Sequence, residues 1–212
     1  MANRITIVGC GPGSIDYLTP AALHAIHAAD VLVGAERLLR LFPEAAAKHI
    51  PLAARTEETL DRIGELLGAK SVAVLVTGDP GLYSLSRQVI RRFGRDCCKL
   101  IPGVSSVQTA FARIGLDWEN ALVLSAHREN PSGDKIDLAR EFDSIAVLTG
   151  RKESASWIAE MIKELGDDRR VFICEDLTLP DERVREVNIE ELARLEIRSR
   201  AVVIIVKASL MA

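Results

Sequence analysis

Short apolar runs alternate with helical patterns along the first half of the chain. Four runs of this kind predict strands, at residues 5–8, 31–33, 72–76 and 100–101. The third run is continuous and rich in valine, which is typical of a buried strand in a parallel sheet. Between the runs, Thr19 as a cap and Pro20 as a first helical residue predict the start of one helix. Apolar spacing predicts further helices over residues 60–67, 85–93 and 107–114.

The second half of the chain has more closely spaced strand patterns. Strands are predicted at residues 121–124, 145–148, 171–174, 184–187 and 202–206. An apolar stripe from Trp157 to Leu165, followed by Gly166, predicts a helix. We therefore expect an α/β protein of two domains, residues 1–116 and 117–212, with a mixed sheet in the second domain and a cleft between the two.

Composition narrows the classes of partner. The 212 residues carry a formal net charge of -3, and aromatic residues make up only 4%. Neither property favours binding to nucleic acid or to an anionic membrane. The N-terminus shows no secretion signal and no apolar stretch is long enough to span a bilayer, so a cytoplasmic protein is expected. The four cysteines form no CxxC pair, and neither a disulfide framework nor a metal site is expected.

A glycine loop, residues 9–14, follows the first predicted strand. A dinucleotide site needs GxGxxG to open directly into a helix, whose N-terminus then holds the pyrophosphate. Here the third glycine comes one position early, Pro12 removes an amide donor, and the helix is expected only from Thr19 or Pro20. Glu36, near the end of the second predicted strand, keeps an NAD(P)-binding oxidoreductase open as an alternative.

Three segments together are more specific than the glycine loop alone. They are VGCGPGSIDYLTP at residues 8–20, TGDPGLYS at 77–84 and IPGVSSVQTAFARIG at 101–115. In this order and spacing the chain resembles the tetrapyrrole (corrin/porphyrin) methylase family. Two further stretches, VGAERLL at 33–39 and ARIGLDWENALVLSAHRE at 112–129, are most similar to members that methylate C-5 of a (cobalt-)precorrin in cobalamin biosynthesis.

The resemblance implies two α/β domains with the methyl donor, S-adenosyl-L-methionine, held in the cleft between them. The positions that match donor-binding residues of the family are Pro12, Gly78, Asp79, Leu82, Ser105, Ser106, Thr149 and Leu177. Their chemistry suits the role, because glycine lets backbone approach a ligand and a carboxylate is attracted to a sulfonium. A simple turn at Gly78 and a helix cap at Ser105 are the structural alternatives.

The catalytic residues are left unassigned. The sulfonium is already an activated methyl donor, so the enzyme is expected to supply alignment and water exclusion. Some relatives carry an acid just after the second strand, and the matching residue here is Ala35. Arg37, His127 and Arg128 are candidates for binding the substrate, whose carboxylates suit arginine; ordinary surface or loop residues are the alternative.

The resemblance also implies partners. In many members the C-5 enzyme is fused to, or paired with, a methyltransferase that acts on C-15 and decarboxylates the substrate, so a separate partner of that kind is expected here. Relatives suggest a homodimer. No resident metal is expected, and any cobalt would belong to the substrate. A methyltransferase of the same fold that acts on another tetrapyrrole position is the alternative function.

Overall fold

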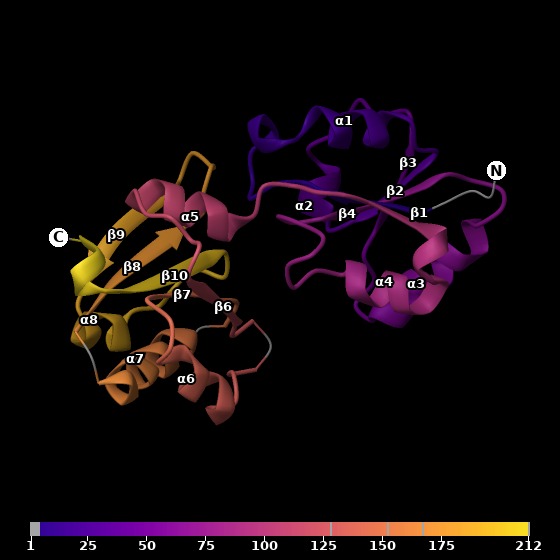
Figure 1. Ribbon diagram of the computed structural model, residues 1–212. Helices are drawn as coiled ribbons and strands as arrows, with labels where there is room; N and C mark the ends of the chain where they lie inside the picture. Colours follow the sequence, from indigo (N-terminus) through magenta and orange to yellow (C-terminus); the bar gives the residue numbers. More distant parts are fainter. Residues whose placement is uncertain (1–4, 128, 152, 167, 212) are drawn as a thin grey trace. The chain divides into compact units, whose positions relative to one another are not determined.

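The computed structural model describes residues 5–127, 129–151, 153–166 and 168–211. The chain divides into two compact units, Met1–Ser105 and Ser106–Ala212. Each unit is built on a five-stranded sheet with helices packed on it (Figure 1). The expected α/β architecture with two sheets is therefore confirmed.

The sheet of the first unit is parallel in every strand pair that the structure describes. Its strand order is β3-β2-β4-β1-β5. The strands are β1 (Ile5–Gly9), β2 (Val31–Gly34), β3 (Lys48–Pro51), β4 (Val72–Val76) and β5 (Cys98–Ile101). Because β4 and β5 lie on either side of β1, the segments that follow these three strands emerge at one edge of the sheet.

Alternation of side chains along the strands fills two separate cores in this unit. Ile7 and Val74 point to the face covered by α3 (Thr56–Leu66) and α4 (Ser86–Phe93). Val8 and Leu75 point to the opposite face, covered by α1 (Pro20–His27) and α2 (Glu36–Leu39). The central strands are thus buried on both sides, which explains why they read as continuous apolar runs. Figure 1 shows α1 on one side of this sheet and α3 and α4 on the other.

The second unit has a mixed sheet, as expected, in the order β6-β7-β10-β8-β9. Its strands are β6 (Ala121–Ser125), β7 (Ser144–Leu148), β8 (Arg169–Glu175), β9 (Arg183–Val187) and β10 (Ala201–Lys207). Strand β6 is parallel to β7, while β10 runs antiparallel to both β7 and β8. The carboxyl ends of β6, β7 and β8 therefore meet the start of β10 at one edge.

Helices cover both faces of this second sheet as well. One face packs on α6 (Gly133–Ala139), α7 (Ser154–Leu165) and α8 (Ile189–Arg194), with Ile145 and Val203 in the shared core. The other face is covered by α5 (Ser106–Ile114), which packs on β10. Short 3-10 turns complete the fold at Ile15–Tyr17, Arg95–Cys97 and Ala208–Met211.

All the strands and helices expected from the sequence are present, and the expected helix start at Thr19 and Pro20 and helix end at Gly166 are confirmed. The Thr19 hydroxyl accepts from the amide of Ala22 at 3.1 Å, with Pro20 as the first residue of α1. Gly166 ends α7 in the left-handed conformation, with φ of 72°. The sequence analysis missed four short elements, namely α2, β3, α6 and α8.

The division between the units falls earlier than the expected boundary after residue 116. The sequence analysis placed α5 in the first domain, whereas the structure groups it with the second unit. Packing on β10 is one reason. The other is Arg113 of α5, whose Nε and Nη2 donate to the two carboxylate oxygens of Glu182 at 2.6 and 3.3 Å. Glu182 also accepts from the backbone amide of Thr178, so it ties α5 to the loop after β8.

Substituting Glu182→Gln tests this tie through its pH dependence. Hydrogen bonding to Arg113 lowers the pKa of Glu182 in the folded protein below its usual value of 4.5. The tie therefore stabilises the fold above about pH 4.5 and is lost as the pH falls through the lowered folded-state pKa. We expect the variant to unfold with about 1–2 kcal/mol less free energy at pH 7, and the difference from wild type to shrink in urea titrations between pH 5 and 3. A difference that stayed constant over that range would contradict the assignment.

Candidate functional site

Three segments far apart in the sequence meet at the carboxyl edge of the first sheet. They follow β1, β4 and β5 and correspond to the glycine loop, the Gly-Asp-Pro-Gly turn and the Pro-Gly-Val-Ser stretch. The amide of Cys10 donates to the carbonyl of Val76 at 2.8 Å, and the amide of Gly78 donates to the carbonyl of Gly11 at 2.8 Å. This edge is where open α/β sheets place their ligands.

Glycine at two of these positions is required by direct contact between backbones. A Cβ added at Gly103 would lie 2.5 Å from the carbonyl oxygen of Gly78, and one added at Gly9 would lie 2.6 Å from the amide nitrogen of Gly103. Real Cβ atoms do not approach backbone atoms so closely. The three segments therefore pack through main chain, with no room for a side chain between them.

Asp79 links two of these segments through both oxygens of its carboxylate. Oδ1 accepts from the amide of Gly81 at 2.7 Å, and Oδ2 accepts from the amide of Gly103 at 3.1 Å. Each oxygen keeps a further lone pair, so the group can still accept from a ligand. Asp79 thus fixes the shape of the turn in addition to any contact that it makes with a ligand.

The other donor-binding candidates of the first unit lie on the same segments. Pro12 is buried in the glycine loop, next to Gly11 with its positive φ of 69°. The amide of Leu82 donates to the carbonyl of Asp79 at 3.2 Å, and Ser105 is 6% exposed where the unit ends. Ser106 is the first residue of α5 and so belongs to the second unit.

The glycine loop does not open directly into a helix. It passes through a 3-10 turn at Ile15–Tyr17, and α1 begins only at Pro20. Glu36, the acidic residue considered for a nucleotide ribose, is exposed and paired with Arg40 at 2.6 Å. These features lack the strand–glycines–helix geometry that a dinucleotide site needs.

A second group of candidates meets at one edge of the second sheet. The amide of Thr149, after β7, donates to the carbonyl of Ala201 at 3.1 Å, and its hydroxyl donates to the same oxygen at 2.9 Å. After β8, the amide of Asp176 donates to the carbonyl of Arg200 at 3.2 Å. Thr149 and the buried Leu177 thus lie beside the strand start that joins them.

Backbone strain occurs in one of the motif segments and on both sides of the donor-binding candidate Leu177. Among the described residues, the non-glycine residues with positive φ are Tyr83 at 44°, Asp176 at 48° and Thr178 at 68°. Tyr83 lies in the Gly-Asp-Pro-Gly turn, and the other two flank Leu177. Such conformations cost about 1–3 kcal/mol each and gather at ligand sites.

A buried carboxylate holds the strained segment around Leu177. Asp176 is 4% exposed and pairs with Arg198 and with Arg200, the latter at 2.7 Å between Oδ1 and Nη2. The neighbouring Glu175, also buried, accepts from the amide of Arg198 at 3.0 Å. This network fixes the loop after β8, and the sequence motifs did not indicate it.

The candidate substrate-binding residues divide between the units. Arg37 follows β2, is exposed, and donates from Nη2 to the hydroxyl of Thr77 at the edge of the first sheet. His127 follows β6, with Nδ1 3.5 Å from the carbonyl oxygen of Thr149. Its ring lies against Gly150, where an added Cβ would come within 1.9 Å of Nδ1. Arg128 lies outside the described residues.

The two buried thiols stay protonated near neutral pH. Burial raises the pKa of Cys10, in the glycine loop, to about 12, and burial raises the pKa of Cys174 to about 12. Neither forms a thiolate near neutral pH, so a cysteine nucleophile at either edge is not supported. Within the described ranges, no three side chains of the metal-binding kinds gather into a metal site.

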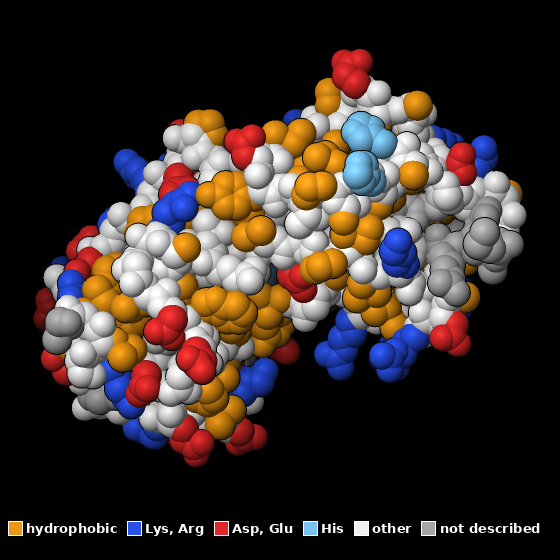
Figure 2. Space-filling view, turned by 45° about the horizontal axis from the view of Figure 1, so that its top comes forward, with side chains coloured by type: hydrophobic (Ala, Val, Ile, Leu, Met, Phe, Trp, Pro, Cys, Tyr) orange, Lys and Arg blue, Asp and Glu red, His pale blue; other side chains and the backbone are white. Residues whose placement is uncertain are grey.

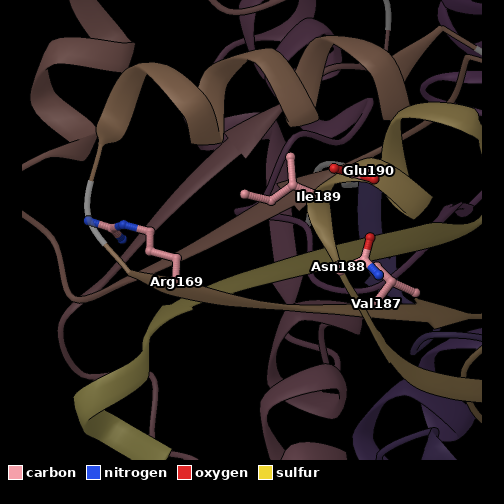
Figure 3. A pocket seen from close by; sticks show the side chains of 5 residues that line it. All are labelled: Arg169, Val187, Asn188, Ile189 and Glu190. Atoms are coloured by element: carbon pink, nitrogen blue, oxygen red, sulfur yellow. The ribbon is translucent and has the colours of Figure 1, made fainter.

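A hollow of about 410 Å³ lies at the opposite edge of the second sheet. It is lined by Arg169, Val187, Asn188, Ile189 and Glu190. Figure 3 shows these side chains at the start of β8 and in the turn from β9 to α8. Two of the polar side chains are already engaged, since Arg169 donates to the carbonyl of Phe142 at 3.2 Å and Asn188 caps α8 at 2.8 Å. The hollow is a structural feature of the turn.

The surface shown in Figure 2 mixes acidic, basic and apolar side chains, and no large field of basic side chains is visible on that face. Within the described residues, every helix is too short or too polar to cross a bilayer.

Residues 4–193 match the family model of the tetrapyrrole (corrin/porphyrin) methylases. The chain belongs to this family and is a methyltransferase. It is 31% identical over 181 residues to cobalt-precorrin-7 C(5)-methyltransferase of Salmonella typhimurium, covering 85% of this chain and 88% of that one.

Two solved structures are similar along nearly the whole chain. One is the precorrin-6Y methylase of Archaeoglobus fulgidus, 28% identical, with a TM-score of 0.75 and coverage of 97% of this chain and 98% of that one. The other is the uroporphyrin-III C-methyltransferase of Thermus thermophilus complexed with S-adenosylhomocysteine, 24% identical, with a TM-score of 0.77 and coverage of 95% and 91%.

Substituting Gly103→Ala tests the backbone contact at the first edge. The new Cβ would overlap the carbonyl of Gly78, so the segments must separate. Forcing extra atoms into packed structure costs about 1–3 kcal/mol, and thermal unfolding should show a corresponding fall in Tm. The control is Gly64→Ala in α3, where the nearest atom is 3.6 Å away; it should be neutral or stabilising by about 0.5–1 kcal/mol. Equal stability of the two variants would refute the contact.

Substituting Asp79→Asn tests the carboxylate bridge. One of the two backbone amides then faces an NH₂ group and loses its acceptor, which costs about 1–3 kcal/mol. Urea denaturation should show this loss. The control is Asp61→Asn, because its pair with Arg92 at 3.3 Å is exposed and should contribute less than about 1 kcal/mol. A variant at Asp79 as stable as the control would show that the bridge does not hold the turn.

Proposed function

We propose that this methyltransferase uses S-adenosyl-L-methionine to add a methyl group to C-5 of a (cobalt-)precorrin in cobalamin biosynthesis. The observation that carries the proposal is the meeting of the three family segments at the edge of the first sheet, fixed by glycine contacts and by Asp79. The similarity to a cobalt-precorrin-7 C(5)-methyltransferase supplies the substrate class and the position.

The residues at the two edges suit an adenosyl sulfonium. At the first edge, the strained turn that contains Tyr83 presents main chain and short side chains, and the Asp79 carboxylate attracts positive charge. At the second edge, Leu177 is held between two strained residues. In the proposed enzyme the donor is also contacted by Pro12, Gly78, Leu82, Ser105, Ser106 and Thr149.

The chain's own contribution is positioning. The donor brings an activated methyl group, so the protein must align the ring carbon with that group and exclude water. The position at which some relatives carry an acid is Ala35, and the adjacent Glu36 is engaged by Arg40. A carboxylate base from this segment is therefore not part of the proposal.

The proposed substrate carries several carboxylates, which explains the proposed roles of Arg37 and Arg128. Arginine forms charge-assisted bonds with carboxylates, and Arg37 stands beside Thr77 at the edge that bears the donor motif. Cobalt, where present, belongs to the substrate. We further propose that this protein forms a homodimer and that a separate partner enzyme methylates C-15 and decarboxylates the substrate. A methyltransferase with the same donor but another tetrapyrrole position is the second candidate.

Donor titration followed by product analysis tests the function. Calorimetry should show saturable binding of S-adenosyl-L-methionine and of S-adenosylhomocysteine, and no heat with NAD(H) or NADP(H). Incubation with precorrin-7, with and without cobalt, should then add the mass of one methyl group, and NMR should locate it at C-5. Because Asp79 shapes the turn, Asp79→Asn should weaken donor binding about tenfold, whereas Asp61→Asn should leave it unchanged.

The outcomes separate the alternatives. Donor binding with methylation at another ring position, or of another tetrapyrrole only, would keep the class of enzyme and overturn the C-5 assignment. The absence of heat with either form of the donor would overturn the proposed function as a whole. Binding of a nicotinamide cofactor in its place would favour the oxidoreductase.

A further inference from the structure

We propose that His127 is the base that takes up the proton released on methylation, with the Thr149 carbonyl and Gly150 as its positioning groups. This inference rests on the proposed function. It starts from an unusual local arrangement: two loops that follow the neighbouring parallel strands β6 and β7 place an imidazole directly on a glycine backbone.

The ring of His127 packs against the backbone of Gly150. An added Cβ at Gly150 would lie 1.9 Å from Nδ1, 2.6 Å from Cε1 and 2.7 Å from Cγ of the imidazole. Only glycine leaves space for the ring to lie there. The start of α7 is tied to the same loop, because the Ser154 hydroxyl donates to the carbonyl of Ala126 at 3.4 Å. The backbone under the ring is therefore held in place.

A backbone carbonyl lies next to Nδ1 of His127. Nδ1 lies 3.5 Å from the carbonyl oxygen of Thr149, which can only accept a hydrogen bond. Thr149 is itself fixed, because its amide and its hydroxyl both donate to Ala201. With its proton on Nδ1, the neutral imidazole can donate to this carbonyl and keep Nε2 as an acceptor. His127 is an exposed residue at the carboxyl edge of the sheet, where a bound molecule can reach its side chain.

The proposed reaction needs such an acceptor. When a ring carbon that bears hydrogen is methylated, it gives an electron pair to the methyl carbon, and the pair of the breaking C–S bond goes to sulfur. The displaced hydrogen leaves as a proton, and its bonding pair restores the conjugated ring. Nε2 takes this proton, and the imidazolium returns it to water after turnover.

The surroundings of His127 contain both signs of charge. The charged residues described on the two loops are Glu129, Arg151 and Glu153. Nearby are Asp176, on the loop after β8, and Arg198 and Arg200, just before β10. Arg151 donates to Asn130 at 2.6 Å, and Asp176 is paired with both of the last two arginines. Because Ala35 stands where some relatives have an acid, the role of base falls to His127 in this proposal.

Three variants test the inference by methyl transfer to precorrin-7 as a function of pH. In wild type, the pH dependence of kcat serves as the reference. For His127→Gln and His127→Ala, kcat should fall by about 10²–10⁴, the shape of this pH profile should change, and donor affinity by calorimetry should stay within twofold. Added imidazole should restore activity to His127→Ala. Gly150→Ala should displace the ring, lower kcat by at least tenfold and leave donor binding unchanged.

His24→Gln is the matched control, because His24 is exposed on α1 and outside both edges; it should behave as wild type. A His127 variant with kcat within threefold of wild type would overturn the inference, as would reduced activity with the wild-type pH profile and no rescue by imidazole. Folding of each variant is checked by urea denaturation. Wild-type protein that binds no donor or transfers no methyl would instead refute the proposed function, and the inference with it.

Discussion

Direct packing of backbone on backbone at the carboxyl edge of the first sheet is the constraint on which the candidate site depends. Gly9, Gly78 and Gly103 come from segments that follow three different strands, and they approach more closely than any side chain would allow. Close contact alone does not fix the conformation of the loops, because glycine is conformationally permissive. The carboxylate of Asp79 fixes that conformation by accepting hydrogen bonds from two backbone amides.

In the second unit, the loops at the carboxyl edge of the sheet are fixed by other interactions. Its edge has no cluster of glycines around Leu177 and instead holds Asp176 and Thr178 in left-handed conformations. The buried carboxylate of Asp176 pairs with Arg198 and Arg200, whose side chains are partly exposed, and these pairs hold the strained segment. Removing one member of such a network would leave a buried charge unpaired, which is far more costly than losing an exposed pair.

The strands and long helices could be predicted from the sequence because burial on both faces leaves continuous apolar runs. The elements that were missed lack this pattern. Strand β3 is a polar edge strand that ends at Pro51, and α2 is a single turn. Helix α6 begins at Gly133 without a side-chain cap, and α8 is short although Asn188 caps it. The placement of α5 also depended on tertiary contacts, chiefly that of Arg113 with Glu182.

The candidate site was only partly accessible from the sequence. The motifs indicated which segments follow strands, and parallel pairing then brings the segments of the first unit together. The motifs did not show that both oxygens of Asp79 are used internally, or that Gly150 accommodates the ring of His127. The strain at Tyr83 and Thr178 has no marker in the sequence, because neither residue type favours a left-handed conformation.

The bridge from Asp79 to Gly81 and Gly103 has a thermodynamic consequence for any ligand of that edge. The bonds that shape the turn lie wholly within the chain, so the turn is ordered before a ligand arrives. The conformational entropy of the turn is therefore lost when the chain folds and not when a ligand binds. Association of a ligand with this turn does not require a loop to close first.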